Sequence, residues 1–203
     1  MNSRPRWLVP VGIVAAIVVL IVLPLIGTYN GLVDKDTKAD QSFADLDAVL
    51  QRRADLIPNA VATVKAALQQ EQTVFGELAR ARANYAGATS DKEKLSASTD
   101  LSGAIGRLLV IVENYPQLQS NKNLQDLQTQ LEGTENRIAQ ARREYNAVIT
   151  SYNRSIRRFP RSLLAGMFGF DKRPLFAAAP ADRTVPQVDL GTSSTTSTTA
   201  AGG

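Results

Sequence analysis

The sequence predicts an all-α protein, with a single N-terminal transmembrane helix followed by an antiparallel helical bundle of long helices. Three observations lead to this class. No charged residue occurs from Trp7 to Val33, apolar residues recur at three- and four-residue spacing over two long segments, and a helix-capping motif lies between those segments. A length of 203 residues suits one domain with an appendage.

A membrane anchor is expected at residues 7–27, after a short basic N-terminus at residues 1–6 that contains Arg4 and Arg6. About 20 apolar residues at a rise of ~1.5 Å cross the ~30 Å hydrocarbon layer. A cleaved signal peptide is the alternative. However, the apolar region of a signal peptide is shorter than this one, and Leu25-Ile26-Gly27 has a large residue where the cleavage site needs a small one. The flanking basic residues favour a cytoplasmic N-terminus, with the main domain outside the cytoplasm.

A seven-residue repeat follows, from Tyr29 to Tyr85. Its two rows are Tyr29, Asp36, Phe43, Leu50, Ile57, Val64, Glu71, Leu78 and Tyr85, and Leu32, Ala39, Leu46, Arg53, Ala60, Ala67, Val74 and Ala81. This spacing, sustained over such a length, predicts bundle or coiled-coil packing. Pro58 either kinks one long helix or lies in the first turn of a second helix capped by Asp55. Because the repeat keeps its phase across Pro58, we favour the kink.

Two further helices are predicted. Ser90-Asp91-Lys92-Glu93 has the form of a capping box and starts a helix that Pro116 ends. The last long helix runs from about Lys122 to Phe159 with its own seven-residue repeat. The bundle domain is therefore expected at residues 28–176, and residues 177–203, rich in Pro and then in Ser, Thr and Gly, are expected to be a disordered tail.

If the last helix returns antiparallel beside the first, Phe159 lies near Tyr29. Each step up one helix is then matched by a step down the other, so the numbers of facing residues sum to about 188. The predicted neighbours are Phe43 with Tyr145, Ile57 with Leu131, Arg53 with Glu135, and Phe159 with Tyr29. Arg53 is the only basic residue on the first seam, and an unpaired buried charge is costly. We therefore expect Arg53 and Glu135 to form a structural ion pair.

Composition argues against most enzyme classes. The chain has no Cys and no His, which removes disulfides, thiol chemistry, most zinc and haem sites and the commonest general base. The candidates for paired-carboxylate or metal chemistry are Asp45, Asp47, Asp55, Glu132 and Glu135. Di-metal sites in bundles usually add His from Glu-x-x-His elements, so we interpret these acids as solvated or salt-bridged and expect no catalytic residue, metal or cofactor.

Two Tyr-Asn pairs, Tyr145-Asn146 and Tyr152-Asn153, lie seven residues apart in the last helix. Both Tyr rings therefore face the seam and both Asn lie beside it. We interpret the tyrosines as core residues whose hydroxyl groups bond across the bundle, in preference to a ligand site.

A basic cluster ends the last long helix. No acid occurs between Glu144 and Asp171, and the cluster consists of Arg154, Arg157, Arg158 and Arg161. These cations either complement the C-terminal end of a helix dipole or contact an anionic surface, such as lipid headgroups. The apolar stretch Leu163–Phe170 that follows either packs on the bundle or lies at a membrane interface. The chain shows no pattern of a nucleic-acid-binding module.

Several motifs together resemble the LemA family. They are Arg52-Arg53 before Asp55-Leu56-Ile57-Pro58-Asn59, then Glu113-Asn114-Tyr115-Pro116, Leu131-Glu132-Gly133-Thr134-Glu135-Asn136-Arg137-Ile138-Ala139, the two Tyr-Asn pairs, and Phe159-Pro160. The resemblance spans roughly residues 29–176. It implies a bacterial membrane protein with an antiparallel helical-bundle body and no established enzymatic activity, and a related member acts in building magnetosome membranes. Ala66, where a Gly is expected after Lys65, and the Ser/Thr-rich tail depart from the family pattern.

These observations lead to two functional hypotheses. The first is a non-catalytic scaffold or adaptor of the bacterial cell envelope, anchored by one span in the inner membrane and binding a protein partner that the sequence does not identify. The alternative is a lipid-binding or membrane-shaping protein that uses the Arg154–Phe170 segment. Neither hypothesis involves nucleic acid.

Overall fold

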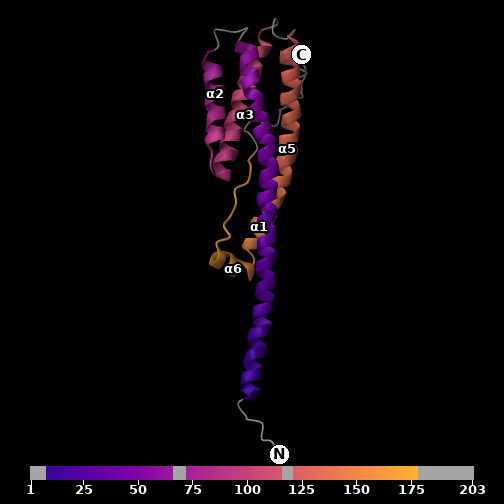
Figure 1. The fold of residues 1–203 in the computed structure, drawn as a ribbon, viewed down its shortest axis with the longest axis vertical. Helices are drawn as coiled ribbons and strands as arrows, with labels where there is room; N and C mark the ends of the chain where they lie inside the picture. Colours follow the sequence, from indigo (N-terminus) through magenta and orange to yellow (C-terminus); the bar gives the residue numbers. More distant parts are fainter. Residues whose placement is uncertain (1–7, 66–71, 116–120, 178–203) are drawn as a thin grey trace, which may run out of the picture.

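The computed structural model describes residues 8–65, 72–115 and 121–177. These residues form five helices and no strand, which confirms the all-α class: α1 (Leu8–Lys65), α2 (Gln72–Gly87), α3 (Asp91–Glu113), α5 (Lys122–Ile156) and α6 (Arg161–Phe168) (Figure 1). The predictions for the basic N-terminus and for the tail beyond Ala177 lie outside the described residues.

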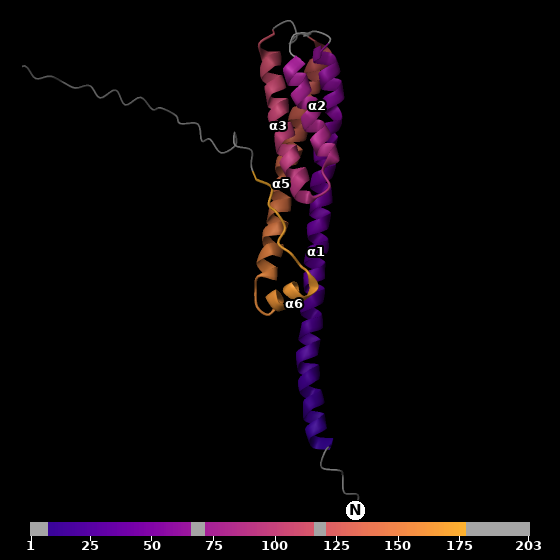
Figure 2. The same ribbon diagram turned by 90° about the vertical axis from the view of Figure 1, so that its left-hand side faces the viewer.

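Helix α1 is a single helix of 58 residues, about 87 Å long at ~1.5 Å per residue. Its N-terminal part extends beyond the bundle alone, and its C-terminal part packs within the bundle (Figures 1 and 2). The most apolar window of α1 is long enough to cross a membrane and has none of its residues buried. Helix α3 is also long and apolar enough, but 44% of its window is buried, as in a core helix.

Helix α1 continues through Pro58, as the phase of the repeat predicts. Proline has no N–H, so the carbonyl group four residues earlier, on Ala54, loses its helical donor. Arg82 Nε of α2 donates to Ala54 O at 3.3 Å. A side chain of the neighbouring helix thus satisfies the acceptor that Pro58 leaves open.

The interpretation of the whole repeat to Tyr85 as one long helix is wrong. Helix α1 ends at Lys65, and α2 begins at Gln72 and runs back beside it (Figure 2). The described part of the bundle therefore consists of α1, α2, α3 and α5. The repeat stays in phase because both helices turn their apolar rows to the same core. Two positions of the repeat, Ala67 and Glu71, lie outside the described residues.

The predicted rows form the core. Fully or almost fully buried members from α1 and α5 are Leu32, Ala39, Leu46, Leu50, Ile57, Ala60, Val64, Leu124, Leu131, Ile138, Tyr145 and Tyr152. Helices α1 and α5 make the most extensive pairing, and the rings of Phe43 and Tyr145 lie 5.9 Å apart between centroids. The antiparallel register predicted for this pair is therefore present.

The prediction that Phe159 lies beside Tyr29 is wrong. Helix α5 ends at Ile156, and the side chain of Phe159 is 81% exposed. The ring of Tyr29 instead contacts Phe168 at 4.8 Å and Phe170 at 6.0 Å between centroids. The chain turns at the end of α5, so α6 and the residues after it occupy the place beside Tyr29.

The capping box of α3 is confirmed. Glu93 N–H donates to Ser90 Oγ at 3.3 Å, and Ser90 N–H donates to Glu93 Oε2 at 3.2 Å. The backbone N–H groups of Thr89 and Ser90, which both donate to the Glu93 carboxylate, hold the pKa of this carboxyl group below its usual value. The reciprocal bonds fix the point at which the chain turns from α2 into α3.

Ser90→Ala should lower the free energy of unfolding by about 1 kcal/mol, because it removes the side-chain acceptor at the start of α3. Chemical denaturation of the full chain in detergent micelles, followed by circular dichroism, measures this change. Ser96→Ala, on the exposed side of the same helix, is the matched control. An equal loss in both variants would contradict the capping role.

Candidate functional site

Arg53 lies at the centre of the bundle, 3% exposed. Its Nη1 is 2.5 Å from Glu135 Oε2 of α5, and its Nη2 donates to Ser102 Oγ at 2.6 Å and to Ser98 O at 3.4 Å on α3. Burial lowers the pKa of Arg53, and the carboxylate of Glu135 opposes this shift. One guanidinium thus links three helices, and the structure brings together the two residues expected to pair.

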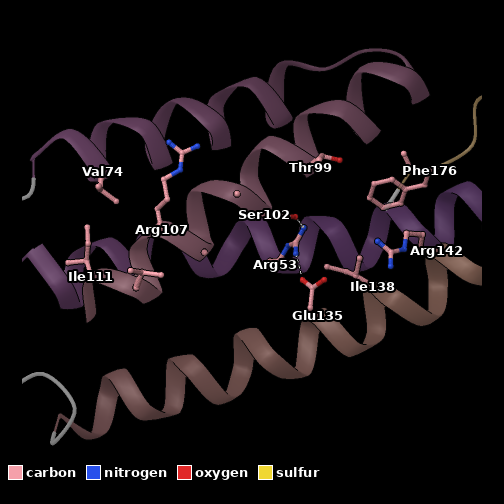
Figure 3. Close-up of a pocket in the computed structure, with 14 residues that line it drawn as sticks. Arg53, Val74, Thr99, Ser102, Arg107, Ile111, Glu135, Ile138, Arg142 and Phe176 are labelled. Atoms are coloured by element: carbon pink, nitrogen blue, oxygen red, sulfur yellow. Dashed lines mark hydrogen bonds and ion pairs between the residues drawn. The ribbon is translucent and has the colours of Figure 1, made fainter. Parts of the chain in front are cut away.

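A groove of about 740 Å³ opens between α3 and α5 above this arginine (Figure 3). Its apolar lining is Val74, Val110, Ile111, Ile138 and Phe176. Gly103 and Gly106 leave the middle of the α3 wall without side chains. Helix α3 packs on α2 and α1 but hardly on α5, so this side of the bundle is open.

The predicted acids are dispersed. Asp47 accepts from Tyr85 Oη at 2.7 Å and pairs with Lys94, and Asp55 accepts from Gln51 Nε2 at 2.8 Å. Asp45 and Glu132 are exposed. Among the described residues, no group of three or more His, Cys, Asp or Glu is placed to hold a metal ion.

The two Tyr-Asn pairs hold an extended strap, residues 171–177. Asn153 accepts from Arg173 N–H at 3.0 Å and donates to Arg173 O at 2.9 Å. Asn146 likewise accepts from Phe176 N–H at 2.8 Å and donates to Phe176 O at 2.9 Å. Each amide thus binds one residue of the strap through both of its backbone groups. Sequence reasoning missed this role because the repeat shows where the amides lie on α5 but not that an extended segment passes over them.

Tyr145 Oη donates to Pro174 O at 2.8 Å, so its hydroxyl bonds to the strap and not to another helix as expected. Burial raises the pKa of Tyr145 to about 12, which keeps the hydroxyl a donor at neutral pH. The bond therefore fixes the strap between the two residues that the asparagines hold.

Arg173 ties the strap to α1. Its guanidinium lies 2.7 Å from Asp36 Oδ1 and 2.6 Å from Asp40 Oδ1, and over the ring of Tyr152 at 5.6 Å. Burial alone would lower the pKa of Arg173, but hydrogen bonds to Asp40 and Asp36 raise it. Asp36, an acid on the apolar seam, is thereby neutralised.

The basic cluster lies at the end of the bundle from which the lone part of α1 extends (Figures 1 and 2). Arg154, Arg157 and Arg158 are exposed. Arg161 is half-buried and donates to Ser155 Oγ at 3.0 Å. In the described part of the chain, no carboxylate lies within ion-pair distance of these four arginines.

Comparison with known proteins gives one family and a small set of relatives. A family model described as the LemA family matches residues 42–190. The chain is 28% identical to "Magnetosome protein MamQ" of Magnetospirillum gryphiswaldense, over 88% of this chain and 78% of the relative. It is 29% identical to "Magnetosome protein MamQ 2" of Paramagnetospirillum magneticum, over 86% of this chain and 75% of the relative.

Removing either partner of the central ion pair should have unequal effects. Glu135 is 58% exposed, so Arg53→Met leaves a solvated carboxylate and an apolar side chain in the core. Glu135→Ala leaves a buried guanidinium short of an acceptor and should cost about 1–3 kcal/mol of unfolding free energy, more than Arg53→Met. Denaturation of the full chain in micelles measures both variants.

Arg143→Met, on the exposed face of α5, is the control and should change the unfolding free energy by less than ~0.5 kcal/mol. The double variant Arg53→Met/Glu135→Ala should resemble Arg53→Met alone, because the buried charge is gone. Additive losses would show that the two side chains are not coupled.

Asn146→Ala should free the backbone groups of Phe176. Loss of two hydrogen bonds predicts at least about tenfold faster hydrogen exchange at the Phe176 amide, measured by mass spectrometry of peptides from the strap. Asn136→Ala, at an exposed position of α5, should leave the rate unchanged. Unchanged exchange in Asn146→Ala would contradict the role of this amide in holding the strap.

Proposed function

The chain belongs to the LemA family, and from this premise we propose that it is a single-pass membrane protein acting as a non-catalytic scaffold or adaptor at the bacterial cell envelope. We place its anchor in the inner membrane, with the N-terminus in the cytoplasm and the bundle outside it. The bundle then holds a partner protein close to the membrane surface.

The exposed apolar part of α1 supports the anchor. Large apolar side chains face solvent on every side of this segment: Val11, Ile13, Val14, Ile17, Val18, Val19, Leu20, Val22, Leu23, Leu25 and Ile26. A helix that is apolar all round is stable when lipid or protein surrounds it. The basic residues before this segment favour a cytoplasmic N-terminus.

The use of the buried and half-buried charged groups supports a non-catalytic role. Arg53, Arg173 and Asp47 each bond to groups on two or more helices or on the strap. These bonds hold the bundle together and leave no nucleophile beside a general base in the described site.

The open groove is the single observation that carries the scaffold proposal. Its walls are apolar, and its lining holds three arginines, Arg53, Arg107 and Arg142, against one acid, Glu135. Arg107 pairs with Glu77 at 2.7 Å at the groove margin. A partner segment with apolar side chains matches this lining, because it covers exposed apolar surface.

Lipid binding by the Arg154–Phe170 segment is a second candidate function, favoured by the position of α6 beside the end of the apolar segment of α1 (Figure 2). This contact is compatible with scaffolding, because the groove and α6 lie on different parts of the bundle.

Photo-crosslinking in intact membranes tests the scaffold proposal. A benzophenone amino acid at Val110, 58% exposed and in the groove, should give a discrete protein adduct. The same group at Asn136, exposed outside the groove, should not.

Gly106→Trp should abolish the Val110 adduct by filling the groove, since a Cβ at Gly106 meets no atom within 4 Å. Gly133→Trp, at an equally open glycine of α5 outside the groove, is the matched control. An adduct that persists in Gly106→Trp, or that forms equally at Asn136, would contradict a docking role for the groove.

A further inference from the structure

A hollow of about 400 Å³ lies at the membrane-facing end of α5. It is lined by Thr150, Asn153, Arg154, Arg157, Arg158, Lys172 and Leu175. Four of these side chains are cations, and none is an acid. Arg154 comes from the last turn of α5, Arg157 and Arg158 follow directly after the helix, and Lys172 comes from the strap that crosses beside them.

The strap is what completes this hollow. Asn153, in the lining, binds Arg173 through both backbone groups, and so holds the neighbouring Lys172 over the end of α5. A helix end alone would offer three solvated arginines. The clamped strap adds a fourth cation and the apolar side chain of Leu175, which together form a concave site.

The hollow lies level with the end of the apolar segment. In the α1–α5 register, Arg154 stands beside about position 34 of α1, and the uncharged stretch of α1 ends at Val33. Helix α6 packs on the same part of α1, with Leu164 and Ala165 buried in one cluster with Leu32. A bilayer around the span therefore has its headgroup layer at the hollow.

The other side of α6 is apolar and largely exposed in the described part of the chain. Leu163 is 61%, Met167 76% and Phe168 55% exposed. A short helix with one buried apolar side, a second exposed apolar side and adjacent arginines has the pattern of an element that lies in the membrane interface.

We propose that the hollow binds the headgroup of an anionic phospholipid, while Leu163, Met167 and Phe168 enter the acyl boundary of the same leaflet. Arg154, Arg157, Arg158 and Lys172 pair with the phosphate oxygens. The contact gives the bundle a second attachment to the membrane besides the span, which limits its tilt. This proposal rests on the second candidate function, lipid binding by the Arg154–Phe170 segment, and does not depend on the scaffold function.

Fluorescence quenching in nanodiscs tests the proposal with the full chain. Trp7 is the only tryptophan, so Trp7→Phe with Met167→Trp reports on α6 alone. Nanodiscs of phosphatidylcholine are compared with nanodiscs in which phosphatidylglycerol replaces about a third of it. Quenching by lipids brominated in the upper acyl chain should increase severalfold with phosphatidylglycerol.

A variant that combines Arg154→Gln, Arg157→Gln, Arg158→Gln and Lys172→Gln should abolish this increase. Arg157→Gln alone should reduce the increase by a factor of about five, because the attraction of one basic residue to an anionic surface corresponds to that change in affinity. The matched control carries four Arg→Gln changes at exposed positions elsewhere on the bundle: Arg52, Arg80, Arg137 and Arg143. It has the same net charge as the hollow variant and should keep the increase.

Three results would overturn the proposal. Equal quenching in both nanodiscs would show that the headgroup is not recognised. An equal loss in the control variant would show an effect of net charge. An equal response to inorganic phosphate in phosphatidylcholine nanodiscs would show that the hollow takes a free anion and not a lipid. Circular dichroism of each variant in the same nanodiscs checks that the helices are retained.

Discussion

The unbroken course of α1 is the constraint on which the rest of the structure depends. The same helix supplies the exposed apolar segment and a central row of buried residues in the bundle. The helix is continuous between the two parts, so the direction of the apolar segment fixes the direction of the bundle. The antiparallel pairing with α5 then returns the chain to the end of the apolar segment, where α6, Tyr29 and the arginine-lined hollow meet.

Polar contacts of Ala54 and Arg53 let α1 remain continuous through the bundle. Pro58 would leave an unpaired carbonyl within the bundle, and Arg82 of α2 supplies its donor. Arg53 would be an unpaired charge on the seam, and acceptors from α3 and α5 bind its two Nη groups. Both contacts join α1 to neighbouring helices. Pro58 and Arg53, which would destabilise α1 in isolation, therefore help to specify which helices pack around it.

Much of the fold could be predicted because a seven-residue repeat is a local property. It gave the buried rows and the register that places Phe43 beside Tyr145 and Arg53 beside Glu135, while Pro116 gave the approximate end of α3. The reversal after Lys65 could not be predicted in this way, because residues 66–71 contain no Gly or Pro and keep the phase of the repeat. The strap was missed for a different reason. Asn146 and Asn153 bind backbone groups, and backbone recognition leaves no side-chain pattern in the bound segment.

A distance measurement across the junction of span and bundle tests the continuity of α1 most directly. The chain has no Cys, so Val18→Cys with Asp45→Cys gives two unique sites for spin labels, both at exposed positions of α1. A continuous helix predicts one narrow distance distribution near ~40 Å between these backbone positions in nanodiscs. A broad distribution, or one centred below about 30 Å, would show a joint between span and bundle and would contradict this account.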